Sequence, residues 1–311
     1  MPTVSVVLPV YNGERFIGEA IQSALDQTFR DFELLVVDDG STDNTETIVR
    51  QSKGPLTYYR QENQGAGAAR NAGVASARGE WIAFMDADDI WETDKLAKQI
   101  EYLQTHPNVS FVYCDMDLID SQGNLIKQGF LSAALARRKR KGRRNLVSLA
   151  FAGQPFPYPS TVLCKRELFL KSGGFSPHFA KNYHEDFELF GRMAHISPLH
   201  FMPESLVRYR QNQRNEERWN SNWSILLDCL MELWRDDPDR SAAVNRHMAY
   251  HWSNQGKRFL RSGDYEKARE YFRQSFAQYP FYWSNLRRWA LSYMIGLRAL
   301  YGRRKTKFVD G

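Results

Sequence analysis

The first 115 residues alternate apolar, β-branched runs with stretches of helical spacing, and this alternation limits the fold more than any other feature. Strand patterns lie at 4–8, 32–37, 56–60 and 81–85, and a fifth lies at 109–113. Near-continuous apolar strands separated by helices predict an α/β domain with a parallel or mixed sheet and helices on both faces. We expect one helix at about 16–25 and another at 66–77. A third helix should begin at the capping box formed by Asp43 and Glu46.

Polar clusters follow three of these strands: residues 9–12, 38–41 and 86–89. In sheets of this kind, ligands bind beyond the carboxyl ends of the strands. The third cluster, Asp-Ala-Asp-Asp, supplies hard oxygen ligands that suit Mg²⁺ or Mn²⁺, and such an ion would neutralise a diphosphate. The alternative for this cluster is a solvated turn before the next helix.

Phosphate and dinucleotide motifs of other classes are missing from the sequence. There is no G-x-x-x-x-G-K-[ST] loop, and the glycines at 65–67 do not directly follow a strand as a dinucleotide fingerprint requires. NAD and P-loop chemistry are therefore disfavoured.

Five motifs in order resemble family 2 glycosyltransferases of the GT-A fold, over roughly residues 1–215. They are residues 7–12, 37–43 and 65–71, the Asp-x-Asp pair of Asp86 and Asp88, and Glu185-Asp186. The resemblance implies a nucleoside-diphosphate-sugar donor, a divalent metal (Mn²⁺ or Mg²⁺), inversion at the anomeric carbon and a carboxylate base.

The resemblance also implies roles for single residues. Asp186 would be the general base, and Glu185 beside it could raise its pKa by like-charge repulsion. The alternative for this pair is two acids favoured by a helix N-terminus. Asp88 would ligate the metal, and Asp86 would reach both the ribose and the metal. The other residues expected to bind the donor or lie near the acceptor are Pro9, Tyr11, Asn12, Asp38, Asp39, Arg70, Gly174 and Arg210.

Within this set, Tyr11 would stack on the nucleobase and Asp39 would accept a hydrogen bond from an imide N–H, which favours UDP. Arg208 and Arg210 are equal candidates for contact with the diphosphate. The segment after them has Gln-x-x-Arg but lacks the Trp that processive synthases carry next. We therefore expect one sugar to be transferred per encounter, in the synthesis of a cell-surface polysaccharide or glycolipid.

The net charge of +6 is concentrated in two segments, 137–144 and 287–307, which each hold seven basic residues and no acidic one. Without these fourteen, 28 basic residues face 36 acidic ones. The basic segments suggest an anionic partner, either a lipid-linked acceptor or a membrane surface, although charge runs are often merely solvated. Three widely spaced cysteines and the lack of a signal peptide indicate a cytoplasmic protein, with a peripheral position on the inner face of the membrane as the alternative.

The C-terminal third, 216–311, reads as all-α. Residues 249–282 have the spacing of one tetratricopeptide-like helical hairpin with its turn at 263–265, and 282–300 reads as an amphipathic basic helix.

Two other function classes remain open at this point. A metal-dependent nucleotidyltransferase would also place a nucleotide and a metal on an α/β sheet, but it would want a glycine-rich loop after the first strand. A catalytically inactive binding module would use the helical hairpin to recruit a partner, and the complete acidic set speaks against it. Binding of nucleic acid is not expected, because no recognised module accompanies the basic run.

Overall fold

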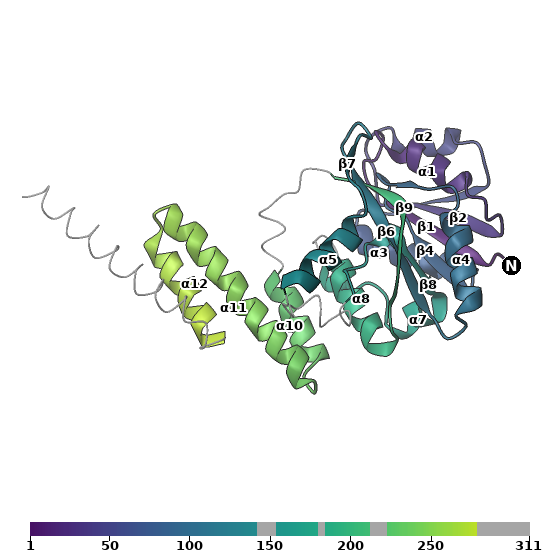
Figure 1. The fold of residues 1–311 in the computed structure, drawn as a ribbon. Coiled ribbons are helices and arrows are strands. Elements are labelled where there is room, and N and C mark those ends of the chain that lie inside the picture. The colour runs from purple at the N-terminus through teal and green to yellow at the C-terminus, as the bar shows by residue number, and fades with distance from the viewer. Residues whose placement is uncertain (142–153, 180–183, 212–222, 279–311) are drawn as a thin grey trace, which may run out of the picture. The chain divides into compact units, whose positions relative to one another are not determined.

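The computed structural model describes residues 1–141, 154–179, 184–211 and 223–278 (Figure 1). The chain divides into two compact units, Met1–Asn222 (the sheet domain) and Trp223–Gly311 (the helical unit). The boundary expected near residue 215 lies outside the described residues.

In the described part of the sheet domain, nine strands form one mixed sheet in the order β3-β2-β1-β4-β8-β6-β9-β5, with β7 paired to β6. The first four strands in the chain pair in parallel, as the sequence predicts. Of the two predicted alternatives, the mixed sheet is confirmed, because β8 inserts antiparallel between β4 and β6. The strands are β1 (Val4–Val10), β2 (Phe32–Asp38), β3 (Leu56–Arg60), β4 (Trp81–Phe84), β5 (Ile90–Trp91), β6 (Phe111–Ile119), β7 (Leu125–Lys127), β8 (Val162–Lys165) and β9 (His200–Arg210).

The register of the central strands brings their carboxyl ends to one edge of the sheet. Val10 of β1 lies beside Asp38 of β2, and Val7 lies beside Phe84 of β4. Because β8 runs antiparallel to β4, its amino end lies at the same edge. Polar residues that follow β1, β2 and β4, or precede β8, therefore meet there.

Helices flank the sheet (Figure 1). The small residues of α3 allow a close approach to β1, since a Cβ added to Gly73 would lie 2.4 Å from Val7 Cγ1. The helices are α1 (Ile17–Leu25), α2 (Thr45–Gln51), α3 (Ala66–Ser76), α4 (Lys95–Thr105), α5 (Phe130–Lys141), α7 (Arg166–Lys171) and α8 (Glu185–Ile196), with short 3-10 turns η1 (Pro159–Thr161) and η2 (Pro177–Phe179).

Strand β6 extends well beyond the apolar run at 109–113, because its two acidic residues are satisfied inside the fold. The buried Asp115 carboxylate accepts the backbone N–H groups of Leu131 (2.8 Å) and Ser132 (3.0 Å), in the first turn of α5. Two residues on, Asp117 accepts from the backbone N–H of Gly129 (2.9 Å). A carboxylate at a helix N-terminus is stabilised by the exposed N–H groups there. These bonds fix where α5 begins.

In the helical unit, the described helices are α10 (Trp223–Leu233), α11 (Pro238–Arg261) and α12 (Tyr265–Gln278). Helices α11 and α12 form a helical hairpin with a turn at Gly263 (φ 80°). Gly256 lets the two helices approach, because a Cβ there would lie 2.7 Å from the Phe272 ring. The rings of Phe259 and Tyr271 stack with centroids 5.3 Å apart. The expected tail helix at 282–300 lies outside the described residues.

Candidate active site

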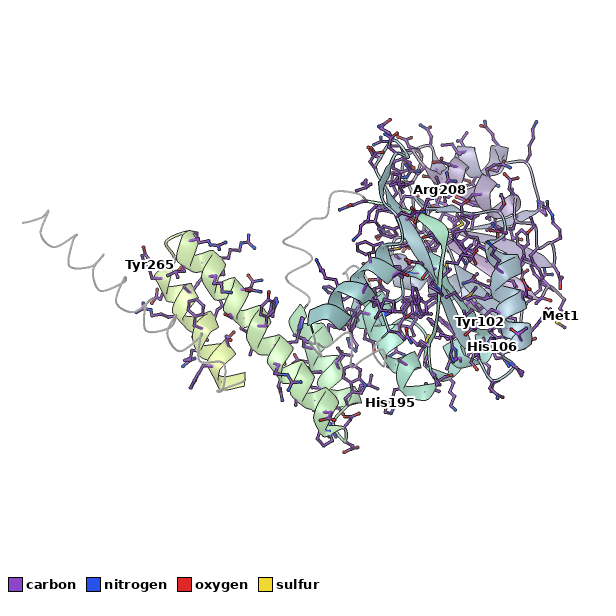
Figure 2. All side chains as sticks on the ribbon, in the orientation of Figure 1. Met1, Tyr102, His106, His195, Arg208 and Tyr265 are labelled. Carbon is purple, nitrogen blue, oxygen red and sulfur yellow. The ribbon has the colours of Figure 1, made fainter. Side chains whose placement is uncertain are left out.

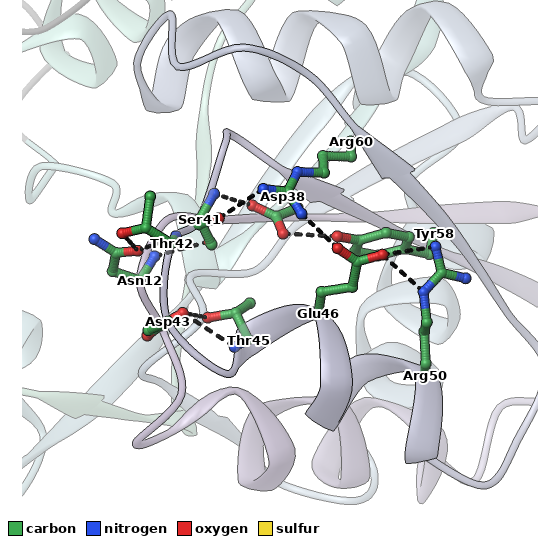
Figure 3. A network of polar contacts seen from close by, with 10 residues as sticks. All are labelled: Asn12, Asp38, Ser41, Thr42, Asp43, Thr45, Glu46, Arg50, Tyr58 and Arg60. Carbon is green, nitrogen blue, oxygen red and sulfur yellow. Dashed lines mark hydrogen bonds and ion pairs between the residues drawn. The ribbon is translucent and has the colours of Figure 1, made fainter.

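The turns that follow β1 and β2 are held together by hydrogen bonds (Figure 3). Asn12 has a left-handed backbone (φ 51°), a conformation that Asn tolerates better than most residues. Its N–H donates to Ser41 Oγ (2.9 Å), and its side-chain oxygen accepts from the Thr42 N–H (2.8 Å). Pro9 is buried within β1, whereas Tyr11 is 52% exposed at the strand end. An aromatic ring with this exposure can stack on a planar ligand.

Asp38 and Asp39 are both buried, and both carboxylates organise loops at the sheet edge. Asp38 accepts from the Ser41 N–H (2.7 Å) and from the Tyr58 hydroxyl (2.7 Å). Asp39 accepts from the Gln61 side chain and from two backbone N–H groups, those of Gln64 (2.9 Å) and Gly65 (2.7 Å). A carboxylate has about four lone-pair positions, so Asp39 retains capacity for one further donor.

Helix α2 does not use the capping box expected from the sequence. Its N-cap residue, Asn44, makes no capping bond through its side chain. Asp43 accepts instead from the backbone N–H of Thr45 (3.0 Å). Glu46 forms ion pairs with Arg50 and Arg60 (Figure 3), which draws its carboxylate away from the start of the helix.

The best-defined feature of the site is an ion bridge centred on Arg70. This residue lies on α3 with only 5% of its side chain exposed. One guanidinium nitrogen lies 2.6 Å from Asp86 Oδ1 and another lies 3.2 Å from Glu185 Oε1. Burial works against the charged form of Arg70, but the carboxylates of Asp86 and Glu185 raise its pKa. Three motifs that are far apart in the sequence therefore meet at one cation.

Asp186 follows Glu185 in the first turn of α8. Its Oδ1 accepts from the Phe187 N–H (2.7 Å). Burial, and next the charge of Glu185, raises the pKa of Asp186 to about 7. Burial also raises the pKa of Glu185, against the opposing effect of Arg70. A carboxyl group with a pKa near neutrality is suited to accept a proton from a substrate.

A turn at residues 173–175 is clamped between α3 and α8. Asn71 donates to the Phe175 carbonyl (2.8 Å) and accepts from the Phe175 N–H (2.9 Å). Arg192 donates to the Gly174 carbonyl (2.7 Å) and pairs with Glu188. Gly174 has φ 68°, and a Cβ there would lie 2.8 Å from Asn71 Oδ1. Glycine is therefore required at this position, both for its backbone conformation and for the space.

Arg210 holds the acidic turn after β4 through hydrogen bonds. The N–H of Arg210 donates to Asp89 Oδ1 (2.9 Å), and its Nε donates to the Asp88 carbonyl (2.8 Å). Its other nitrogens reach the Asp120 carbonyl (3.1 Å) and Glu19 (2.6 Å). Burial, and next the charges of Asp88 and Asp86, raises the pKa of Asp89 well above its ordinary value. With its side chain 2% exposed, Arg210 positions the turn in this structure.

The other arginine candidate differs from Arg210. Arg208, labelled in Figure 2, is 50% exposed and pairs with Glu92 (2.7 Å). Arg208 and Arg210, which the sequence left equivalent, therefore differ in burial. Both side chains pair with carboxylates of the same chain.

Asp86 and Asp88 are the carboxylates of this site that could hold a divalent cation together with a substrate. Within the described residues, no three His, Cys, Asp or Glu side chains gather in a metal-binding arrangement. Mg²⁺ is often held by one or two carboxylates together with substrate phosphates and water. Asp88, partly exposed, offers one carboxylate, and Asp86 offers a second whose Oδ1 is bonded to Arg70.

Two residues of the site were missed by reasoning from the sequence. Asn71 lies inside a recognised motif, but nothing in that pattern shows that it holds Phe175. Ser160 accepts the backbone N–H of Asp86 through Oγ (2.9 Å), and its carbonyl accepts from the Trp91 indole (2.9 Å). No sequence signal marks Ser160, because its role depends on the antiparallel insertion of β8.

Comparison with known families agrees with this geometry. The family described as glycosyl transferase family 2 matches residues 5–173. A glycosyltransferase of Rickettsia typhi, termed uncharacterised, is 33% identical over 238 residues, which are 74% of this chain and 73% of the relative. One from Rickettsia prowazekii is 32% identical over 67% of this chain and 64% of the relative. The chain belongs to glycosyl transferase family 2.

The matched part is a smaller share of other relatives. It spans 39% of glycosyltransferases from Rickettsia felis and Rickettsia conorii.

Solved structures show the same GT-A type of fold. S. aureus TarS 1–349 in complex with UDP has a TM-score of 0.58 at 20% identity, covering 82% of this chain and 72% of that one. The mannosyltransferase PcManGT from Pyrobaculum calidifontis, in complex with GDP-Man and Mn²⁺, has a TM-score of 0.58 at 21% identity, covering 98% and 82%. At these identities the likeness shows the fold alone.

The first basic segment is described only in part. Residues 137–141 form the C-terminal end of α5, and the side chain of Arg137 is exposed there. Residues 142–144 and the whole of 287–307 lie outside the described residues. Among the helices that the structure describes, none is long and apolar enough to span a bilayer.

Proposed function

We propose that this chain transfers one sugar from a nucleoside-diphosphate sugar to a hydroxyl group of an acceptor, with inversion at the anomeric carbon. Family membership supports glycosyl transfer. The observation that carries the finer proposal is the bridge from Arg70 to Asp86 and Glu185, next to Asp186. It gathers a cation and three carboxyl groups at the edge where the central strands end.

The reaction we propose is a single displacement. The acceptor oxygen attacks the anomeric carbon, and the new C–O bond forms as the bond to the diphosphate oxygen breaks. The nucleoside diphosphate leaves, and the acceptor proton passes to the Asp186 carboxylate. Burial, and next the like charge of Glu185, raises the pKa of Asp186 to about 7, so its carboxylate can take the acceptor proton near neutral pH.

A divalent cation held by Asp88 and Asp86 would stabilise the negative charge on the departing diphosphate. Mn²⁺ and Mg²⁺ both suit carboxylate and phosphate oxygens. Arg210 supports this role indirectly, because it fixes the backbone carbonyl of Asp88.

We favour a UDP-sugar as the donor. Tyr11 would stack on the base, and the remaining acceptor capacity of Asp39 would receive an imide N–H. TarS forms complexes with UDP and UDP-GlcNAc, whereas PcManGT binds GDP-Man, so the two nucleotides need to be compared directly.

Thermal-shift measurements with UDP-, GDP- and dTDP-sugars in the presence of Mn²⁺ test this proposal. We expect one nucleotide to stabilise the protein selectively and the effect to vanish in Asp88→Ala. The matched control is Asp94→Ala, which removes an aspartate that pairs with Lys98 on the helix surface. Lack of stabilisation by every sugar nucleotide, or an equal shift in Asp88→Ala, would contradict the proposal.

We further propose a glycan or lipid-linked acceptor and a peripheral position on an anionic membrane, on the inner face. The basic end of α5, with the exposed Arg137, supports this. Sedimentation with liposomes tests it: vesicles that contain anionic lipid should bind the protein, and neutral vesicles should not. Equally weak binding to both would remove the membrane from the proposal.

A further inference from the structure

A connected group of aromatic rings lies beside the first turn of α8. Phe156 stacks on Phe187 with centroids 5.2 Å apart and an interplanar angle of 17°. Tyr158 meets Phe156 edge-on at 5.1 Å and Tyr209 edge-on at 5.2 Å. Phe130, at the start of α5, reaches Tyr158 at 6.4 Å. We call Phe156, Tyr158 and Tyr209 the aromatic platform.

Each member of the platform adjoins a residue of the candidate active site. Phe156 stacks on the residue that directly follows Asp186. Tyr158 lies two residues before Ser160, whose hydroxyl holds the backbone N–H of Asp86. Tyr209 directly precedes Arg210, which holds the carbonyl of Asp88. The chain therefore carries the platform next to segments that supply the expected base and hold the acidic turn.

The exposure of these rings distinguishes them from a core cluster. Phe84, Phe169 and Phe175 also form an aromatic group in this domain, with centroids 5.6 to 5.9 Å apart, and all three are at most 3% exposed. By contrast, the platform residues are only partly buried.

A pyranose ring matches this surface. One face of such a ring carries C–H groups that pack on the electron-rich face of an aromatic ring, while its hydroxyl groups stay available for hydrogen bonds. The tyrosine hydroxyls add polar groups at the edge of the platform. A ring held there would bring a hydroxyl toward Asp186. A nucleobase is not needed at this place, since Tyr11 at the end of β1 is the exposed ring beside Asp38 and Asp39.

We propose that Tyr158 and Tyr209 form an acceptor subsite that binds a pyranose ring of a glycan. This inference rests on the proposed function, because it assigns the substrate class for the same reaction. Phe156 stacks on Phe187 of α8 and packs edge-on against Tyr158, which in turn meets Tyr209. Phe130 is left out of the subsite because the Lys127 ammonium lies 4.9 Å from its ring centroid.

Saturation-transfer NMR tests the subsite directly. The probes are methyl glucoside, methyl galactoside, methyl N-acetylglucosaminide and their β-linked disaccharides, each with UDP and Mn²⁺ present. We expect transfer to the C–H protons of at least one probe, about tenfold weaker in Tyr158→Ala and Tyr209→Ala, as loss of one aromatic contact implies. Tyr158→Phe and Tyr209→Phe keep the ring and should retain binding.

The control is Tyr102→Ala, which removes a partly buried tyrosine that stacks on His106 (4.1 Å) on α4 (Figure 2). It should leave the probe signals unchanged. The thermal shift produced by UDP and Mn²⁺ should be retained in all variants, and it also reports whether each variant is folded.

Three results would overturn the subsite: no transfer to any saccharide while UDP binds, undiminished signals in both alanine variants, or transfer to farnesyl phosphate but not to any saccharide. Failure of the proposed function looks different, because then no sugar nucleotide shifts the melting of the unaltered protein. In Tyr158→Ala and Tyr209→Ala, a higher KM for the acceptor, with unchanged release of nucleoside diphosphate in the absence of acceptor, would support the subsite.

Discussion

Arg70 and Asp86 are joined by a 2.6 Å ion pair across which the third helix meets the acidic turn after β4. The same guanidinium also reaches Glu185 on α8 and lies 5.2 Å from the ring centroid of Phe175. Its charge is therefore enclosed on several sides by groups that the active site needs.

Replacing Arg70 by Met should destabilise the protein strongly. Removal of one partner from a buried ion pair leaves an uncompensated charge, which costs about 3–5 kcal/mol. The matched control is Arg78→Met: Arg78 pairs with Glu33 but is 67% exposed, so about 0–1 kcal/mol is expected. Urea denaturation of both variants measures the difference. Equal losses would show that the bridge is not a buried pair in solution.

Asp186→Asn should abolish proton abstraction while leaving the donor bound. The amide oxygen can still accept the Phe187 N–H, so the local structure is kept. We expect transfer to fall about 10²- to 10⁴-fold, the range for loss of a general base, with little change in the UDP-dependent thermal shift. Full activity in this variant would exclude Asp186 as the base.

The same carboxyl group predicts opposite effects of pH on activity and stability. Its folded pKa, about 7, lies above the ordinary 3.8, so the folded state binds more protons between these values and stability falls as pH rises through that window. Activity instead rises through about pH 7, as the base ionises. Asp186→Asn should thus be more stable than the unaltered protein at pH 8, where the free-energy cost of the buried, ionised Asp186 carboxylate is fully present. A flat difference between the two from pH 4 to pH 8 would contradict the assignment.

Arg210→Met should loosen the acidic turn and weaken metal-dependent binding of UDP. The change removes the hydrogen bonds to the Asp88 and Asp120 carbonyls and the pair with the exposed Glu19, at a cost of about 1–3 kcal/mol for each buried group left unpaired. Arg208→Met is the control on the same strand. Arg210→Lys should recover little, because an ammonium cannot replace the guanidinium fork. Thermal shifts with UDP, measured with Mn²⁺ and with EDTA, separate the metal effect from stability. Identical shifts in Arg210→Met and Arg208→Met would refute the positioning role.

The sequence predicted the parallel part of the sheet well because each strand there is a short apolar run with its own turn. It predicted the joining of the Arg70, Asp86 and Glu185 motifs only through resemblance to a family. Ser160 and Arg210 could not be assigned from local pattern. Their contacts depend on β8 and β9, which enter the sheet from distant parts of the chain, and on buried carboxylates such as Asp115 that lengthen a strand beyond its apolar run.

Lys95 offers a test of burial away from the active site. Its side chain is fully buried on α4, donates to Gln99 Oε1 (2.8 Å) and lies 3.9 Å from the Trp91 ring centroid. Burial lowers its pKa to about 8 from the ordinary 10.5. Between these values the unfolded state binds more protons, so the cost of the buried ammonium, fully present below pH 8, is relieved as pH rises to 10.5.

Lys95→Met should therefore be more stable relative to the unaltered protein at pH 7 than at pH 10.5, and the difference should shrink by about 3 kcal/mol, at about 1.4 kcal/mol per unit of pKa. Urea denaturation at the two pH values measures this. Lys98→Met is the matched control with the opposite sign: the bonds that the Lys98 ammonium donates to Asp94 and Glu204 raise its pKa, so its contribution to stability is fully present below the unfolded pKa and is lost as pH rises through the folded pKa. If both variants change in the same direction with pH, the Lys95 ammonium is not buried as the structure places it.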